Sequence, residues 1–337
     1  MPPVGRVAEL WRYPVKSMGG QRVDQAVLGP RGVRTDRLWA VRDLGTDVLA
    51  TARRLPGLLT CEARFDGEPA ADVGPGRPWP VVVTFPDGEE LRSDDARVHA
   101  RLGELLGRRV RLVPLAPLGD RRAHRAGLQT PASVRRDLGL DRDDRLPARP
   151  AIPLRTLLRL ARYATPPGSH VDVFPVHLLS TTTLATLAAE TSESAGTSGS
   201  QVDVRRFRPN VVLELVGDAR GQPGGHPDGA DPGLPEHGWS GGTLRLGGAR
   251  LDVVTPTVRC VVPTRPQPDL PLDRELMRAV ARRADRFAGA YAEVAVGGTV
   301  REGDEVALAP GRPPGVVRRA ADRALAAALQ QAVRLGS

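Results

Sequence analysis

The chain has 337 residues with 40% hydrophobic content, which is enough for two ordinary domains with packed cores. No stretch approaches the roughly 18 consecutive apolar residues of a membrane span, and the first residues lack the apolar run of a secretory signal, so we expect a cytoplasmic protein without a membrane segment. The two cysteines, Cys61 and Cys260, are too few for a disulfide framework or an iron–sulfur cluster on this chain. The net charge is +9, but aromatic residues make up only 4%, so the arginines lack the interleaved rings of a single-strand platform and we do not expect nucleic acid as a partner.

The first third of the chain alternates short apolar runs with turn signals, which is the pattern of a β-barrel-like domain. The expected strands are Val7–Tyr13, Val23–Leu28, Leu38–Asp43, Leu58–Phe65, Val81–Phe85 and Val110–Val113. One helix interrupts them, because Ser93 is a capping residue and apolar residues recur at helical spacing from Val98 to Leu106. Gly107 can end that helix. We therefore predict an N-terminal β-barrel-like domain over residues 1–115.

The next segment, residues 116–150, is rich in Arg, Pro, Gly and Asp without periodicity, so we predict a basic linker or an extended loop. Around it, residues 101–162 hold fifteen arginines against six acidic residues, a surplus equal to the net charge of the whole chain. Such a surface suits an acidic partner protein, and a solvated basic face is the alternative.

A second β-barrel-like domain with peripheral helices is predicted over residues 151–310. Its expected helices lie at about 153–163 and 181–190, and its expected strands are Val211–Leu215, Thr243–Leu246, Arg250–Val254, Val261–Val262, Tyr291–Val296 and Glu305–Leu308. Thr191–Gln201 and Gly217–Gly238 are too polar to bury a core, so we expect mobile loops there. Ala and Leu at helical spacing predict a tail helix in residues 311–337. The fold class is therefore mainly β, of the α+β type.

Lys16 and Ser17 follow the first expected strand and precede a pair of glycines, whose N–H groups can approach an anion. Lys16 is the only lysine of the chain. An ordinary turn at a strand end is the alternative interpretation.

Four other polar residues are candidates for binding an anion. Arg37 opens one expected strand, and Arg208 and Asn210 precede another, with Pro209 expected to hold Arg208 extended. Ser180 stands at the expected start of a helix, whose free N–H groups and dipole attract phosphate. Surface ion pairs and a simply capped helix are the alternatives.

Cys260 follows Arg259 at the edge of an expected strand, where a guanidinium can hold a thiol as thiolate. A thiolate is a metal ligand or a nucleophile, whereas the alternative is a small buried apolar side chain. We expect Cys61, which lies in an apolar run, to be a small buried side chain of the core.

Two sets of motifs resemble a known family. Tyr13-Pro14-Val15-Lys16-Ser17, Asp36-Arg37-Leu38-Trp39 and Thr51-Ala52-Arg53 resemble the N-terminal β-barrel domain that precedes MOSC domains. Phe207-Arg208-Pro209-Asn210, Arg259-Cys260, Gly298-Thr299-Val300 and Gly303-Asp304-Glu305-Val306 are similar to the MOSC domain itself. The resemblance covers residues 4–310.

This resemblance implies a molybdenum cofactor in the cleft between the domains, with the metal bound by the pterin dithiolene and one cysteine. By that likeness Cys260 is the metal ligand and the catalytic residue. The matching cofactor-binding positions are Lys16, Ser17, Arg37, Ser180, Arg208, Asn210 and Arg259. A soft thiolate suits the metal, while arginine, lysine and a helix start suit the phosphate. The characterised relatives are amidoxime-reducing enzymes, so the expected activity is the reduction of N-oxygenated or related oxidised small molecules.

The chain departs from the family pattern at two places. Val258 stands where many relatives have a small or polar residue, so one hydrogen bond to the cofactor is expected to be missing. The segment Pro263–Pro268 replaces an acidic turn common in the amidoxime reducers, which leaves the substrate class open.

The MOSC-like region is followed by Cys-free residues, so electrons are expected from an external ferredoxin- or flavodoxin-like donor with its reductase. Three alternatives remain at this point: a sulfur or molybdopterin carrier without redox turnover, a pyridoxal-phosphate enzyme that uses Lys16 as Schiff base, and a non-catalytic domain whose basic linker recruits a partner.

Overall fold

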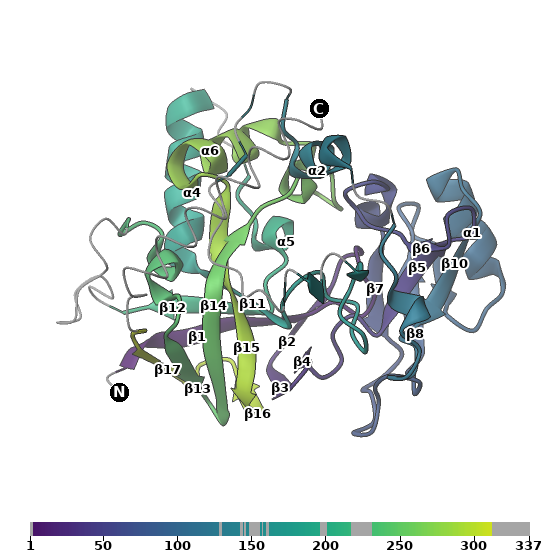
Figure 1. Cartoon of the computed structure of the whole chain (residues 1–337), viewed down its shortest axis with the longest axis horizontal. Coiled ribbons are helices and arrows are strands. Elements are labelled where there is room, and N and C mark those ends of the chain that lie inside the picture. The colour runs from purple at the N-terminus through teal and green to yellow at the C-terminus, as the bar shows by residue number, and fades with distance from the viewer. Residues whose placement is uncertain are drawn as a thin grey trace.

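Strand β1 (Pro3–Arg12) pairs on both sides with strands from the second half of the chain, and these pairings close a barrel (Figure 1). The computed structural model describes residues 3–127, 130–141, 144, 146–147, 156, 158–159, 162–195, 201–216 and 231–311. The seven barrel strands follow each other in the order β12-β11-β15-β14-β13-β17-β1, and β1 then meets β12. The other six are β11 (Val176–Ser180), β12 (Val211–Leu215), β13 (Thr243–Leu246), β14 (Ala249–Val258), β15 (Phe287–Val296) and β17 (Glu305–Ala309). β11 and β12 pair in parallel, and the other neighbours are antiparallel.

The register of β1 follows from its apolar side chains and one glycine. Val4, Val7 and Leu10 are buried in the barrel core, where the inner faces of the other strands meet them. Gly5 lies opposite Leu215, and a Cβ atom there would stand 2.1 Å from the carbonyl oxygen of Glu214. The close approach of β1 to β12 therefore requires glycine at this position.

The longer strands show the period of two that a barrel wall imposes. In β14, the first, third, fifth, seventh and ninth residues are buried, and the residues between them are more exposed. Side chains of this kind from each strand fill the interior, with Trp239 of the 3-10 helix η3 (Pro235–Trp239) packed against them. Burial of one such apolar side chain stabilises the fold by about 1.5–3 kcal/mol.

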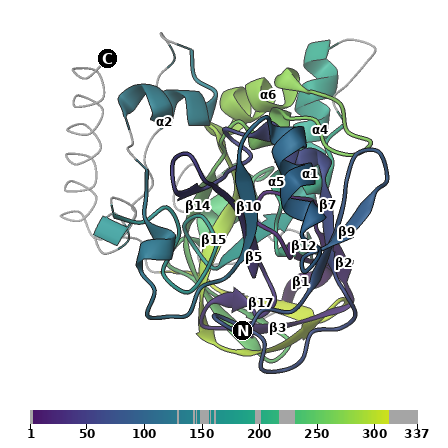
Figure 2. The ribbon, with the colours of Figure 1, turned by 90° about the vertical axis from the view of Figure 1, so that its right-hand side faces the viewer.

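A second body is built from residues that follow β1, and it lies beside the barrel on the right of Figure 1. Its strands are β5 (Trp39–Asp43), β6 (Val48–Leu49), β7 (Glu62–Phe65), β8 (Val81–Thr84), β9 (Glu90–Arg92) and β10 (Val110–Pro114), with η1 (Pro56–Thr60) and α1 (Arg97–Leu106). They form two three-stranded sheets, β10-β5-β6 and β7-β8-β9, around a separate apolar core. α1 buries Val98 and Leu102 against that core, and Figure 2 shows it beside β10.

Three short strands that lie between β1 and the second body in the chain pair and pack on the barrel side. β3 (Gln25–Gly29) pairs with β4 (Gly32–Val33) and also with β16 (Gly298–Arg301) from the far end of the chain. β2 (Gln21–Val23) adds to β1 at the barrel. The N-terminal segment is thus part of the barrel as well as of the second body.

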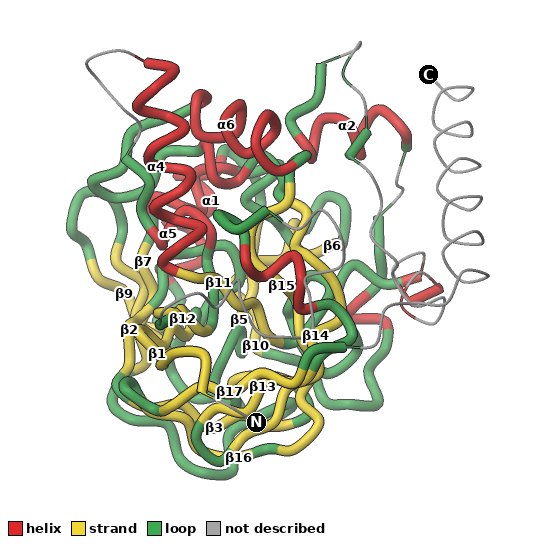
Figure 3. Tube along the Cα trace, turned by 90° about the vertical axis from the view of Figure 1, so that its left-hand side faces the viewer, coloured by secondary structure: helices red, strands yellow, loops and turns green. Residues whose placement is uncertain are grey.

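Four helices complete the described chain. They are α2 (Pro131–Leu138), α4 (Thr181–Ala195), α5 (Val204–Phe207) and α6 (Arg274–Ala284). α2, α4 and α6 lie on one side of the barrel strands in two perpendicular views (Figures 1 and 3). Leu187 of α4 and Leu276 and Val280 of α6 share an apolar cluster with Phe207. The helices therefore cover the end of the barrel at which β11 and β14 finish.

The expected fold class is confirmed: the chain is mainly β, of the α+β type, with a closed barrel and peripheral helices. The domain bounds 1–115, 116–150, 151–310 and 311–337 stay predictions, although β1 connects the first region to the barrel of the third. The expected tail helix and most of the helix expected at 153–163 lie outside the described residues. No helix in the described ranges has both the length and the apolar character that crossing a membrane requires.

Several local expectations need correction. Val261–Val262 is not a strand, because Val262–Thr264 forms the 3-10 helix η4. α1 starts at Arg97, and the Ser93 hydroxyl instead accepts a hydrogen bond from Val81 N–H at 3.1 Å. α2 and η2 (Arg122–His124) lie in the stretch expected to be a linker, since Thr130 and Ser133 form a capping box for α2. α6 follows an Asp273 cap and was not expected.

Candidate functional site

A cavity lies where the loops of the second body meet the end of the barrel. Its lining comes from the turn after β1, the residues before β5, the turn after β6, the loop before β11, the residues before β12, and the end of β14 with the residues that follow it. β11, α5 and β15 contribute one residue each. The lining residues are Lys16, Ser17, Arg37, Thr51, Ala52, Arg53, Val171, Asp172, Phe174, His177, Phe207, Arg208, Asn210, Val258, Arg259, Cys260, Val262 and Tyr291. Five of them are cations and one is a carboxylate, so the cavity selects for an anion.

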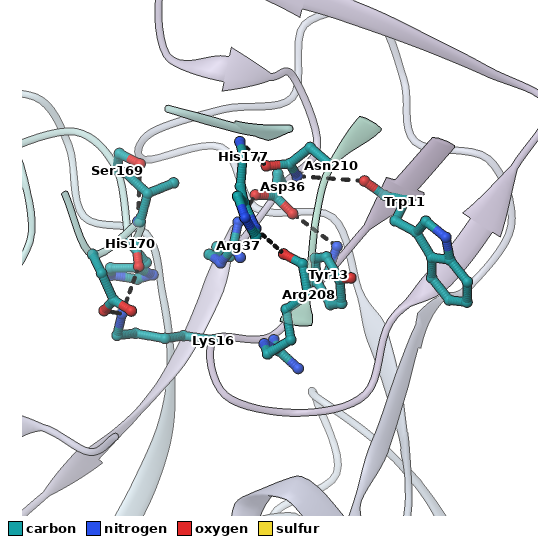
Figure 4. Close-up of polar contacts among 12 residues, drawn as sticks. Trp11, Tyr13, Lys16, Asp36, Arg37, Ser169, His170, His177, Arg208 and Asn210 are labelled. Carbon is teal, nitrogen blue, oxygen red and sulfur yellow. Dashed lines mark hydrogen bonds and ion pairs between the residues drawn. The ribbon is translucent and has the colours of Figure 1, made fainter. Parts of the chain in front are cut away.

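The Lys16 ammonium sits on one wall and is almost fully buried, at 4% exposure. It donates to the His170 carbonyl at 2.9 Å and forms an ion pair with Asp172 (Figure 4). Burial lowers the pKa of Lys16, while Asp172 acts in the opposite direction. Arg53 reaches the same carboxylate at 3.6 Å, so one anion is shared by two cations. Burial alone would raise the pKa of Asp172, but Lys16 and Arg53 lower it by more, and the carboxyl stays ionised.

Two guanidinium groups stack on the ring of Tyr13, and Figure 4 shows the three side chains together. The guanidinium carbon lies 5.1 Å from the ring centre for Arg37 and 4.3 Å for Arg208. Arg37 is paired with Asp36, which also accepts from the Tyr13 N–H at 2.8 Å. Arg208 has no carboxylate partner among the described residues, and burial lowers its pKa to about 10.

Left-handed backbone marks three positions of the cavity. Ser17, Arg37 and Arg208 have φ values of 70°, 52° and 57°, and they are three of the seven described non-glycine residues with positive φ. This corrects the expectation that Pro209 holds Arg208 extended. Such a conformation costs about 1–3 kcal/mol at a non-glycine residue, and it persists where surrounding contacts fix it. All three residues line the cavity.

Arg259 is held from both sides of the cavity. It donates from Nη2 to the Phe207 carbonyl at 2.7 Å, and its Nη1 lies 3.3 Å from Nε2 of His177. The pKa of His177 lies well below its usual value, so the ring is neutral. Burial is the largest cause of this shift, and the charge of Arg259 adds to it. Within the described part of the chain, Nε of Arg259 and Nη2 of Arg208 are buried without a hydrogen-bond partner. Buried donors without partners are costly, and these two border the cavity.

Cys260 lies two residues after the end of β14 and is partly exposed to the cavity. Its side chain packs with Ala52, Leu59 and Val262, which come from both bodies. Burial lowers the pKa of Arg53, but Asp172 and then Cys260 raise it by more, so Arg53 and Cys260 are electrostatic neighbours. Among the described residues, no group of three or more His, Cys, Asp or Glu side chains could hold a metal ion. A metal at this place would need ligands from a cofactor as well as from Cys260.

Cys61, in contrast, lies in the core of the second body with no exposure, and burial raises its pKa to about 12. The expectation that it is a core side chain is confirmed.

Two of the expected site residues line the cavity, but their side-chain polar atoms form hydrogen bonds with other residues of the protein. The Ser17 hydroxyl accepts from the Ala52 N–H at 3.0 Å. Asn210 accepts from the His177 N–H at 3.2 Å and donates to the Trp11 carbonyl at 3.4 Å. These residues shape the cavity by connecting its walls.

Ser180 is a correction, because the structure does not bring it to the cavity. It is fully buried, and its hydroxyl caps α4 by accepting from the Thr183 N–H at 3.1 Å. The carboxylate of Glu236, also fully buried, accepts from the Ser180 N–H and from the Thr183 hydroxyl. A side chain of this protein therefore occupies the helix start at which a phosphate was expected.

The cavity therefore assembles Lys16, Ser17, Arg37, Arg208, Asn210, Arg259 and Cys260 from the sequence candidates. Sequence reasoning did not select Thr51, Arg53, Asp172, His177 and Tyr291. Arg53 stands in a motif already recognised, Thr51-Ala52-Arg53, and could have been chosen from it. Asp172, His177 and Tyr291 carry no local pattern, since their roles depend on residues distant in the chain.

Comparisons with known proteins agree on two regions. A family model described as the MOSC N-terminal beta barrel domain matches residues 4–97, and one described as the MOSC domain matches residues 169–307. No curated protein matches the chain.

Solved structures give weaker likenesses. The YUAD protein from Bacillus subtilis has 11% identity and a TM-score of 0.40, with 92% of this chain and 97% of that chain covered. YiiM from Escherichia coli has 16% identity and a TM-score of 0.27, with 46% of this chain and 63% of that chain covered. TM-scores of this size do not establish a common fold, so the family assignment depends on the two domain matches.

Proposed function

Since this chain belongs to the MOSC family, which is associated with molybdenum cofactor binding, we propose that its cavity binds a molybdopterin cofactor and that the protein is an oxidoreductase. The observation that carries the proposal is the donor set. Five cations face one carboxylate around a partly exposed cysteine, and two buried guanidinium nitrogens of the cavity lining, on Arg208 and Arg259, have no partner among the described residues.

The residues present fit such a cofactor chemically. A phosphate and a pterin ring offer several acceptors, and the unpartnered donors of Arg208 and Arg259 need acceptors. A thiolate is a soft ligand that suits molybdenum bound to dithiolene sulfur. The cavity has a volume of about 90 Å³, so it can enclose part of the cofactor, and the remainder would extend beyond it.

Each side chain then has a definite task. Arg208 and Arg37, stacked on Tyr13, present fixed guanidinium groups to an anion. Lys16 and Arg53 supply positive charge on the opposite wall, and Asp172 holds both of them in place. Cys260 would ligate the metal, and Arg53 is its electrostatic neighbour.

Two further residues orient this set. Neutral His177 accepts from Arg259 and fixes the guanidinium direction. Tyr291 stands against His177, with ring centres 5.7 Å apart, and burial raises its pKa to about 12, so it keeps its proton on Oη at neutral pH.

When bound, a molybdenum–pterin group supplies a two-electron redox centre at which the oxygen of an N-oxygenated or related oxidised small molecule can leave as water after two protons and two electrons arrive. The electrons require an external donor, and we propose a ferredoxin- or flavodoxin-like protein with its reductase. The exposed arginines Arg121, Arg122 and Arg125 are the proposed docking face for an acidic donor of this kind.

Metal and pterin analysis of the purified chain tests the proposal. Protein from a host that makes the cofactor should hold about one molybdenum and one pterin per chain, and it should reduce benzamidoxime with a chemical electron donor. Cofactor without turnover would favour the carrier alternative. A lysine aldimine that borohydride traps, with no molybdenum, would favour the pyridoxal-phosphate alternative and overturn the proposal.

A further inference from the structure

A second cavity adjoins the first. Lys16, Thr51 and Arg53 line both cavities, so these three side chains form the partition between them. The second cavity has a volume of about 450 Å³. This size lies in the range of sites for small organic molecules, about 300–1,000 Å³, and exceeds what a simple oxyanion fills.

Part of the lining of the second cavity is apolar. Val48, Leu49, Ala50, Leu55 and Ala164 supply this surface from the second body and from the segment before β11. Such a surface can bind the hydrocarbon part of an organic molecule, for which removal from water is favourable.

The charged residues of this cavity are mostly paired with each other. Arg108 bonds Asp43 at 3.0 Å, and Arg54 lies 3.6 Å from Oδ2 of Asp137. The lining residues include four cations and two carboxylates, so the cavity would repel a ligand that carries a positive charge.

Two oxygen atoms at this cavity stay unsatisfied. Oδ1 of Asp137 and Oγ1 of Thr51 are buried and have no hydrogen-bond partner among the residues that the structure describes. Asp137 is only 9% exposed, so water can reach it poorly. A buried carboxylate oxygen without a donor is costly, and a ligand N–H or O–H would remove that cost.

The second cavity also lies next to the proposed metal ligand. The carbonyl of Asp137 accepts from the N–H of Val261 at 3.0 Å, and Val261 is bonded to Cys260. Arg53, which lines both cavities, is an electrostatic neighbour of Cys260. A molecule bound against Asp137 is therefore held close to the reacting cysteine.

We infer that the second cavity is the substrate subsite, and that it takes a neutral, mostly apolar organic molecule whose N–H or O–H donates to Oδ1 of Asp137. That the bound molecule is the substrate rests on the proposed function, whereas the existence of the binding site does not. Thr51 is the second polar contact, at the partition to the cofactor cavity.

Binding of three small probes to the full-length, molybdenum-loaded protein tests this inference by calorimetry. Benzamide, benzoate and benzamidine share one ring, but at neutral pH they carry a neutral donor, an anion and a cation. Benzamide should bind about tenfold more tightly than the other two, because only it combines a donor with zero charge. Asp137→Asn, which keeps the shape and removes the charge, should weaken benzamide binding about tenfold.

A glycine pair provides a matched control for filling the cavity. Gly127 lines the second cavity, and a Cβ atom there would meet Val48 at an ordinary 3.5 Å, so Gly127→Leu can project into the space. Gly119 lies in an exposed part of the chain with open space around its Cβ position. Gly127→Leu should abolish benzamide binding, whereas Gly119→Leu should leave it unchanged.

The outcomes separate this inference from the proposed function. Benzamide binding that Asp137→Asn and Gly127→Leu both leave unchanged would overturn the subsite. Loss of molybdenum and pterin in these two variants would also overturn it, since the second cavity would then belong to the cofactor. A protein without molybdenum that still binds benzamide through Asp137 would support the subsite while the proposed function fails.

Discussion

The guanidinium of Arg259 and the imidazole of His177 form a directed pair across the floor of the cavity. Arg259 can only donate, so Nε2 of His177 accepts at 3.3 Å, and Nδ1 carries the proton toward the Arg208 carbonyl at 3.4 Å. This arrangement needs a neutral ring, which agrees with the lowered pKa of His177. One histidine thereby connects Arg208 and Arg259, the two cavity-lining arginines that have unpartnered donors among the described residues.

Acid should destabilise the fold through its buried histidines. Burial lowers the pKa of His170 to about 3, below the value of about 6.5 in an unfolded chain. Between these values the unfolded chain binds a proton that the folded chain does not, so stability falls as the pH drops. Each such group contributes about 1.4 kcal/mol per pH unit. We expect the free energy of unfolding, measured with urea at pH 7 and pH 5, to change less with pH in His170→Gln than in the wild type, by about 1.4 kcal/mol per pH unit. The same pH dependence in both proteins would contradict this role of His170.

Replacing Cys260 by Ala should separate turnover from cofactor retention. The arginines and Lys16 still contact the pterin and its phosphate in this variant, while the proposed metal ligand is gone. We expect the reductase rate to fall at least about 100-fold and the pterin content to fall only a fewfold. Pterin analysis and a benzamidoxime assay measure both quantities. Cys61→Ala changes a side chain in the core of the second body, so the activity per folded molecule should stay at the wild-type level. A wild-type rate for Cys260→Ala would show that the ligand assignment is wrong.

Lys16→Arg distinguishes an electrostatic role from a covalent one. Arginine keeps the positive charge beside Asp172, so part of the activity should remain, whereas a Schiff-base enzyme would lose all of it. Lys16→Met removes the charge and leaves Asp172 with Arg53 alone, and it should lower cofactor content by about tenfold or more. Equal activities of the two variants would contradict an electrostatic role.

Ser180→Ala should weaken the fold without affecting the cofactor. The variant loses the cap on α4, which costs about 0.5–2 kcal/mol, but Ser180 does not line the cavity. Thermal unfolding should therefore shift to lower temperature while molybdenum content stays at the wild-type level. A selective loss of molybdenum from a folded Ser180→Ala protein would restore the phosphate-binding role expected from the sequence.

The exposed arginines in and beside η2 should control reduction by an acidic donor protein. Charge reversal to Glu at Arg121, Arg122 and Arg125 should slow reduction by a ferredoxin by about tenfold or more at low salt, and leave reduction by dithionite unchanged. Raising the ionic strength should produce the same loss in the wild type, because charges more than about 8–10 Å apart are then screened.

A matched variant checks that location, rather than net charge, decides the rate. Arg245, Arg250 and Arg301 are also exposed but lie on barrel strands and on β16. Reversing these three should change ferredoxin-dependent reduction little. Equal effects of the two triple variants would indicate a general charge effect and no docking face.

Local patterns predicted most strands because a barrel wall imposes a period of two, as β14 shows. They predicted those cavity residues that lie in a recognisable sequence motif, such as Lys16 and Arg259. They failed where a partner lies far along the chain. Ser180 has the sequence of a phosphate-binding helix start, but Glu236, 56 residues later, fills that place. Asp172 is similarly invisible in sequence, since it matters through Lys16, 156 residues away.

α6 was missed for a different reason. Asp273 is a capping residue, and Leu276, Met277 and Val280 follow at helical spacing, so the signal is present. The surrounding arginines and prolines conceal it, because the segment also has the composition of a surface loop.

The part that β1 plays in the barrel restricts how relatives of this chain can recombine. A crossover within residues 116–150 would join one parent's β1 to the other parent's β12 and β17, and their registers, with Gly5 against Glu214, would have to agree. A mismatch would leave two barrel edges open to pairing with other chains. Two junctions, one just after Arg12 and one before Val176, keep all seven barrel strands from one parent, so functional chimaeras should be found more often with this pair of junctions than with a single one at the apparent domain boundary.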